Sequence, residues 1–179
     1  HPEVLRLFML QSHYRSPVDY SDDSLSEARA ALFRCYRTLQ QMKELQGQLA
    51  AGSKPVATQP SGRVDDYVNA FQMLKDKFNE AMDDDFNAAQ ALGYVFDMVR
   101  QMNNFMMKEK SMPVADKTAV LAAAIRVFDY FGSVLGVINS DADQFFVLYR
   151  ETELRRRELN ADEIEELIRQ RQSAREAKD

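Results

Sequence analysis

The sequence predicts an all-α protein, an antiparallel helical bundle with about four long helices and shorter helices at its flanks. Apolar residues recur three and four positions apart over four long stretches, which is the spacing of one face of a helix. No stretch shows the strict alternation of apolar and polar residues that indicates a strand. With 179 residues, 45% of them hydrophobic, the chain is long and apolar enough to bury a core.

The first element is a short helix over about residues 2–11. Pro2 suits the first helical turn, where its missing N–H is not needed, and Val4, Leu5, Phe8 and Met9 are its expected apolar face. Pro17 disfavours a helical conformation at the preceding residue, so SHYRSPVDYS (12–21) is expected to be a connector. Tyr14 and Tyr20 are expected to pack it down, with their hydroxyl groups paired.

The first long helix is expected to end near Gln46. Ser24 and Glu27 have the spacing of a capping box, to which Ser21 or Asp23 could contribute. The predicted apolar stripe consists of Leu25, Ala28, Leu32, Cys35, Leu39 and Met42. The following residues, 47–62, are rich in Gly, Pro and Ser, which predicts a flexible linker.

Three further apolar stripes follow the linker, and a turn at 108–113 separates the last two. The second stripe is Val64, Tyr67, Phe71, Leu74, Phe78 and Ala81; the third is Phe86, Ala89, Gly93, Phe96, Val99 and Met106; the fourth is Val120, Ala124, Val127, Phe131, Leu135 and Ile138.

The tail begins after a break at residues 139–141. A compact apolar cluster is expected at Phe145, Phe146, Leu148 and Tyr149. Asn160 and Glu163 suit a capping box for a last helix with Ile164, Leu167 and Ile168 on one side.

Composition and charge exclude several classes of protein. The net charge of −5 disfavours non-specific DNA binding, which needs a broad basic surface. A single cysteine fits a reducing compartment, and we expect a cytoplasmic protein. No apolar run approaches the roughly 18 residues of a membrane span, and the N-terminus lacks the features of a signal peptide. The chain starts without Met and ends inside an apparent helix, so we expect a fragment of a longer protein.

The residue types of known catalytic and metal sites are scarce. A di-metal bundle needs inward-facing Glu-x-x-His pairs, and one cysteine with two histidines cannot supply a tetrahedral zinc site. Cys35 lies on the first apolar stripe and is expected to be a buried thiol, not a nucleophile. Asp83, Asp84 and Asp85 could bind a divalent ion, but we expect them to cap the helix that follows. No catalytic, cofactor-binding or metal-binding residue is therefore predicted.

Two groups of cations could meet an anionic partner. Arg155, Arg156 and Arg157 alternate with acidic residues, which favours a solvated face with salt bridges. Arg34, Arg37 and Lys43 lie away from the apolar stripe of the first long helix and could contact a polyanion.

Three stretches give the sequence a specific resemblance. HPEVLRLFMLQSHYRSPVDYS (1–21), FNEAMDDDFNAAQALGYVFDMVRQMN (78–103) and LNADEIEELIRQRQSAREAKD (159–179) resemble, in the same order, segments of the cysteinyl-tRNA synthetases, which are class I aminoacyl-tRNA synthetases. The sequence departs from the family in two places: Glu3 to Arg6 read Glu-Val-Leu-Arg in place of Asp-Ala-Leu-Arg, and Ala88-Ala89 replace the usual Thr-Pro.

The resemblance implies a division of the chain. Residues 1–21 would be a remnant of the stem-contact region and a connector after a missing KMSKS loop. Residues 22–140 would be the DALR-type bundle, similar to the anticodon-binding domains of class I synthetases. Residues 141–179 would be a helical tail that leads to a truncated anticodon-recognition region.

The resemblance also implies a function. The parent enzyme would activate cysteine with ATP and Mg, would use one Zn, and would esterify the cysteine to its tRNA. The fragment itself would hold no cofactor and no catalytic site. It would orient the tRNA beside the missing catalytic domain, without a role for DNA or a membrane. His13, Arg15, Arg34, Arg37 and Lys43 are the expected nucleic-acid-binding residues.

Two alternatives remain open. The chain could belong to the related ligase that joins cysteine to an amino-sugar in mycothiol synthesis. It could also be a free-standing helical module that binds another protein.

Overall fold

Four long helices form a bundle, as the sequence predicts. The computed structural model describes residues 1–52 and 62–176, and within these ranges it contains seven α-helices and no strand. The helices are α1 (Pro2–Leu10), α2 (Asp22–Gly52), α3 (Gly62–Asp83), α4 (Ala88–Lys108), α5 (Val114–Leu135), α6 (Ala142–Arg156) and α7 (Ala161–Glu176). The all-α prediction is confirmed.

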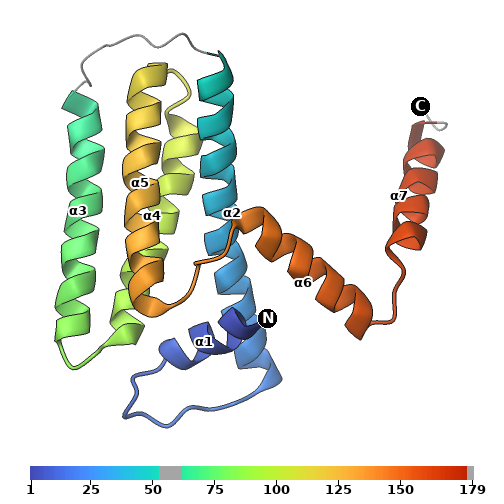
Figure 1. Ribbon diagram of the computed structural model, residues 1–179, viewed down its shortest axis with the longest axis horizontal. Coiled ribbons are helices and arrows are strands. Elements are labelled where there is room, and N and C mark those ends of the chain that lie inside the picture. Colours follow the sequence, from blue (N-terminus) through green and yellow to red (C-terminus); the bar gives the residue numbers. More distant parts are fainter. Residues whose placement is uncertain (53–61, 177–179) are drawn as a thin grey trace. The chain divides into compact units, whose positions relative to one another are not determined.

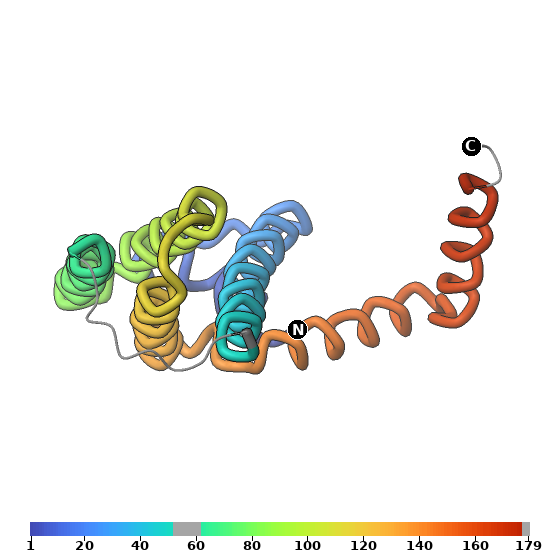
Figure 2. The backbone as a smooth tube through the Cα atoms, turned by 90° about the horizontal axis from the view of Figure 1, so that it is seen from above, coloured from blue at the N-terminus to red at the C-terminus, as the bar shows by residue number. Residues whose placement is uncertain are grey.

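Helices α2 to α5 alternate in direction along the chain (Figure 1). Seen end-on, α3 lies beside α4 and α5, and these two separate it from α2 (Figure 2). Helix α1 crosses one end of the bundle and packs on α2 and α4. This arrangement leaves one side of α2 facing solvent, next to α4.

The core is aromatic and rich in methionine. The largest fully buried side chains of the bundle include Tyr36, Phe71, Phe78, Phe105, Phe128, Phe131, Met42 and Met98. The second and fourth predicted stripes are largely confirmed. All their side chains are buried except Tyr67 of the second stripe and Val127 of the fourth, which are of intermediate exposure.

The third predicted stripe is wrong in register. Phe86 is 69% exposed and precedes α4, and Gly93 is also exposed. The buried residues of α4 are Ala88, Ala91, Leu92, Val95, Met98, Val99, Met102 and Phe105. Because α4 packs on α1, α2, α3 and α5, its buried arc is too wide for a single stripe to identify.

The predicted apolar face of α1 is half wrong. Val4 and Phe8 are buried, but Leu5 and Met9 remain 51% and 52% exposed. Leu7 is fully buried in their place, and the carboxylate-bearing Glu3 is buried with it. Positions 3 and 7 are one turn apart, so the helix presents this face to the bundle.

The start of α2 agrees in part with the prediction, and its end differs from it. Ser21 precedes the helix and exchanges hydrogen bonds with Ser24: each backbone N–H donates to the other residue's hydroxyl, at 3.0 and 3.1 Å. The predicted contribution of Ser21 to the cap is therefore confirmed, and its partner is Ser24 in place of a Ser24–Glu27 box. At the other end α2 continues to Gly52, so the linker prediction is wrong for 47–52. Its part over 53–61 lies outside the described residues.

The chain divides into two units, which we describe separately. One comprises Pro2–Ala142, and the other comprises His1 with the residues from Asp143 onward. In the second unit Phe145 is buried against His1 and Phe146, with ring centroids 4.9 and 5.4 Å away. Leu148 is 52% exposed, so the predicted apolar cluster is only partly buried.

Helix α7 starts where the sequence predicts. The Asn160 side chain accepts a hydrogen bond from the Asp162 N–H at 2.9 Å, and no residue of α7 is buried. An ion pair at 2.8 Å joins Arg150 of α6 to Glu165 of α7.

Helix α5 is apolar enough to cross a membrane by length and composition alone. The prediction that no apolar run of the sequence is long enough to span a membrane is therefore wrong for this helix. About 44% of the apolar window is buried inside the protein, which fits the core helix of a bundle.

Candidate nucleic-acid interface

The five predicted nucleic-acid-binding residues lie in three separate places. Arg34 and Arg37 lie on the exposed side of α2, and Lys43 lies on another side of the same helix. His13 and Arg15 lie in the connector between α1 and α2. The structure therefore does not bring all five into one cluster.

Three side chains of the connector converge on one carboxylate, that of Asp85. The Tyr14 hydroxyl donates to Asp85 Oδ1 at 2.7 Å, and the Arg15 guanidinium lies 3.0 Å from Asp85 Oδ2. His13 Nε2 lies 3.9 Å from the same oxygen. The hydrogen bond to Asp85, followed by burial, raises the pKa of the Tyr14 phenol. Arg15 is thus already paired with an anion, which makes it a weaker phosphate ligand.

The aspartates that precede α4 do not have the predicted role. Asn87 is the N-cap, because its side-chain oxygen accepts a hydrogen bond from the Gln90 N–H at 3.1 Å. Asp85 and Phe86 adopt left-handed backbone conformations with φ of 53° and 54°, which turn the chain between α3 and α4. The prediction that the aspartates cap α4 is wrong, and Asp85 instead anchors the connector.

The described residues, 1–52 and 62–176, contain no group of three or more His, Cys, Asp or Glu side chains that could hold a metal ion. Cys35 is fully buried, and burial raises the pKa of its thiol to about 12. A thiol held neutral in this way cannot serve as a nucleophile near neutral pH. The prediction of a buried core thiol is confirmed.

Lys43 forms a partly exposed ion pair, with its Nζ 3.7 Å from Asp141 Oδ2. In the second unit, Arg156 and Arg157 lie 3.0 and 3.2 Å from Glu153. Burial would raise the pKa of Glu153, but the two arginines outweigh it and the pKa is lowered. The predicted salt-bridged face is confirmed for these residues.

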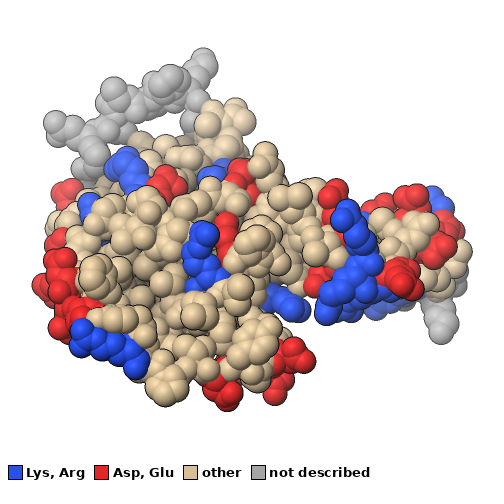
Figure 3. Space-filling model, turned by 60° about the horizontal axis from the view of Figure 1, so that its bottom comes forward, with Lys and Arg blue, Asp and Glu red and all other residues tan. Residues whose placement is uncertain are grey.

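Arg34 and Arg37 differ from the other candidates. Both are exposed, and neither forms an ion pair with any residue in the described ranges. On the face of the bundle that Figure 3 shows, the lysines and arginines are scattered over a mostly uncharged surface. The two arginines are therefore the strongest candidates for phosphate contacts.

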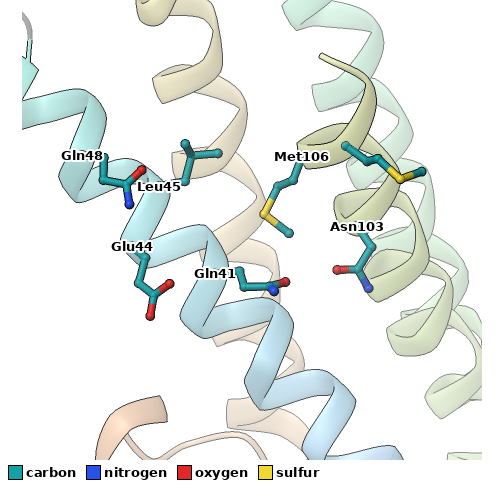
Figure 4. A pocket seen from close by; sticks show the side chains of 7 residues that line it. Gln41, Glu44, Leu45, Gln48, Asn103 and Met106 are labelled. Atoms are coloured by element: carbon teal, nitrogen blue, oxygen red, sulfur yellow. The ribbon is translucent and has the colours of Figure 1, made fainter. Parts of the chain in front are cut away.

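A groove adjoins the two arginines along α2. Gln41, Glu44 and Gln48 continue their face of the helix, since residues three, four and seven apart share a face. The groove has a volume of about 360 Å³ and is lined by Gln41, Glu44, Leu45, Gln48, Asn103, Met106 and Met107. Figure 4 shows side chains of α2 and α4 on its opposite sides. This groove was not predicted, because it depends on which helices become neighbours.

A buried carboxylate is the second feature that sequence reasoning missed. Glu3 accepts hydrogen bonds from the Tyr36 hydroxyl at 2.8 Å, the Ile138 N–H at 2.8 Å and the Ser140 hydroxyl at 3.1 Å. Burial raises the pKa of the Tyr36 phenol. The available signal was the position of Glu3 one turn before Leu7, on the face that packs.

Arg6 of α1 also contacts the loop that follows α5. The Arg6 guanidinium donates to the Gly136 carbonyl, and Gly136 and Ile138 have φ of 67° and 61°. A left-handed β-branched residue is strained, and the Glu3 carboxylate binds its N–H. Glu3 and Arg6 thus fix α1 to the loop that follows α5.

Comparison with known proteins agrees with this architecture. The sequence model of the DALR domain matches residues 77–139, from the end of α3 to the loop after α5. Residues 3–6, which resemble the motif that gives the domain its name, lie outside that match.

Relatives match the whole chain. A cysteine–tRNA ligase of Geobacter sulfurreducens is 41% identical over 99% of this chain and 34% of its own length. Those of Geobacter metallireducens and Pelobacter propionicus are 39% and 37% identical, over 99% of this chain and 35% and 36% of their own lengths. The chain spans about a third of the length of the curated relatives it matches. The chain is therefore similar to about a third of a cysteine–tRNA ligase, and it contains a segment that matches the DALR domain.

Proposed function

We propose that this chain docks and orients the tRNA for cysteine within a cysteine–tRNA ligase. The rest of that enzyme activates cysteine with ATP and esterifies it to the tRNA. The observation that carries the proposal is the match of 99% of the chain to cysteine–tRNA ligases, with a DALR domain inside it.

The electrostatics of the bundle support a docking role. An acidic protein can bind RNA through a local set of cations, and Arg34 and Arg37 offer two that form no ion pair within residues 1–52 and 62–176. His13, Arg15 and Lys43 would contribute less, because their acidic neighbours offset the charge.

The chemistry of the full enzyme would lie outside this chain. Its only cysteine is buried, and His13 lies beside Asp85. These residues do not fit the ligand set of a zinc ion, so we assign no zinc, ATP or Mg contact to them. We propose the catalytic domain as an intramolecular partner and the cytoplasm as the location, without a role for DNA or a membrane.

The two alternatives have less support. The relatives are named as cysteine–tRNA ligases, which favours the tRNA-dependent enzyme over the ligase of mycothiol synthesis. Because the similarity extends along the chain, it also disfavours an independent helical module.

A competition experiment tests the proposal. Labelled cysteine tRNA is bound to the 179-residue protein and displaced with unlabelled cysteine tRNA or an unrelated tRNA. Displacement at a lower concentration of the cysteine tRNA is expected. Equal displacement by both would leave only generic RNA binding and contradict a role in orienting the cysteine tRNA.

A further inference from the structure

We infer that the groove between α2 and α4 binds one unpaired nucleotide of an RNA, with Arg34 and Arg37 holding the adjacent phosphates. This inference rests on the proposed function and extends it to a specific subsite. Three observations carry it: the shape of the groove, the amide groups on its walls, and the uncompensated charge beside it.

The groove lies between two neighbouring helices that run in the same direction (Figures 1 and 4). Its volume of about 360 Å³ falls at the lower end of the range for small-ligand sites, about 300–1,000 Å³. Leu45, Met106 and Met107 supply apolar surface, and methionine adapts well to a flat aromatic ligand. A single base fits these dimensions better than a folded partner.

The polar lining matches the edge of a base. Gln41 and Gln48 from α2 and Asn103 from α4 each offer an amide donor and an acceptor. Such amides pair with base edges, and most readily with adenine. The Thr38 hydroxyl donates to Asn103 Oδ1 at 3.1 Å, which orients this amide and leaves its N–H donors available to a ligand.

The charge beside the groove selects a polyanion. Arg34, Arg37 and Gln41 lie on successive turns of one face of α2, so both cations adjoin the amides. Glu44 is the one acidic side chain in the lining. Two arginines that pair with no anion in the described part of the chain favour a phosphate-bearing ligand over a polypeptide.

An unpaired nucleotide fits better than a double-stranded stem. In a stem the Watson–Crick edges are already paired, and proteins contact it mainly through phosphates and 2′-hydroxyls. Arginines alone would serve that purpose. The three amides and the apolar side chains that line the groove can bind a base only if that base leaves the stack and exposes its edge.

Two double variants of the 179-residue protein separate the roles. Arg34→Ala with Arg37→Ala removes the phosphate ligands, and Gln41→Ala with Gln48→Ala removes the base ligands. Lys77→Ala with Arg126→Ala is the control, because both residues are exposed cations on other helices, α3 and α5. Affinity for cysteine tRNA is measured by filter binding at several salt concentrations, after circular dichroism has shown that each variant is folded.

The arginine variant should bind at least roughly tenfold more weakly, and the slope of log affinity against log salt should fall by about 2. The glutamine variant should lose roughly tenfold in affinity with an unchanged slope, because it removes uncharged base contacts. The control should change affinity by less than about threefold.

Two results would overturn the inference. If the wild type binds tRNA and both groove variants behave like the control, the groove is not the RNA site, but the proposed docking function stands. If the glutamine variant alone behaves like the control, the groove does not bind a base, and the inference fails while the proposed docking function stands. If the folded wild-type protein binds no tRNA at any salt concentration, the proposed function and this inference fail together.

Discussion

At the scale of single residues, Glu3 shows how one buried carboxylate can join three segments. Its oxygens accept hydrogen bonds from Tyr36 of α2 and from Ile138 and Ser140 of the loop after α5. The position of Glu3 one turn before Leu7 is the only local signal of its burial, and it does not identify the partners, which are 33 to 137 positions away. Residue roles of this kind depend on tertiary contacts and cannot be derived from sequence spacing.

Replacing Glu3 should therefore destabilise the bundle. Glu3→Ala leaves the buried Ile138 N–H and Tyr36 hydroxyl without this acceptor, which should cost about 3 kcal/mol of unfolding free energy. Urea denaturation measures the loss. Glu80→Ala, at an exposed position of α3, is the control and should change stability by less than about 0.5 kcal/mol. Equal effects of the two substitutions would show that the Glu3 contacts contribute no stability.

Cys35 should be unreactive in the folded protein. Burial raises the pKa of its thiol to about 12, so the thiolate is scarce at pH 8. A thiol reagent at pH 8 should label the native protein only as fast as it unfolds, and should label the urea-unfolded chain at once. Fast native labelling would contradict the burial of this thiol.

The raised pKa also predicts the direction of a pH effect. The neutral thiol is favoured in the folded state, so its stabilising effect is complete below the thiol's ordinary pKa, near 9. That contribution should be lost as the pH rises from about 9 towards 12. Unfolding free energies measured at pH 8 and pH 10.5 should therefore fall with pH.

At the scale of helices, sequence periodicity located the elements better than their faces and ends. It located most core positions of α3 and α5, but it misplaced the stripe of α4, which packs on four helices. The Gly and Pro content after residue 46 predicted a linker too early, because α2 continues over residues 47–52. Propensity is a weak constraint where a long helix can extend by adding one hydrogen bond per residue.

Two glycines in helix interiors should respond in opposite ways to alanine. A Cβ at Gly132 of α5 would lie 2.7 Å from Asn139 Oδ1 and 2.8 Å from the Val137 carbonyl oxygen, so Gly132→Ala should cost about 1–3 kcal/mol. A Cβ at Gly93 of α4 would meet nothing within 4 Å, so Gly93→Ala should stabilise by roughly 0.5–1 kcal/mol. Urea denaturation distinguishes the signs, and destabilisation by both would contradict the close approach assigned to Gly132 alone.

At the scale of the whole molecule, the sequence was enough to predict the fold class and the similarity to cysteine–tRNA ligases, but not the arrangement of the candidate site. The motifs SHYRSPVDYS and MDDDFN lie about 70 residues apart, yet Tyr14 and Arg15 of the first bind Asp85 of the second. This contact takes Arg15 out of the set of available cations, which a sequence cannot reveal. Arg34 and Arg37 stand out only once the ion pairs of the other candidates are known.

The central claim is that this chain docks tRNA through a small number of phosphate contacts. Its most direct test is a titration of labelled cysteine tRNA into the folded 179-residue protein at 50 and 200 mM salt. Because phosphate contacts release counterions, binding should be measurable at low salt and should weaken by roughly tenfold or more at high salt for two contacts. No binding at low salt, or an affinity that does not depend on salt, would contradict this account.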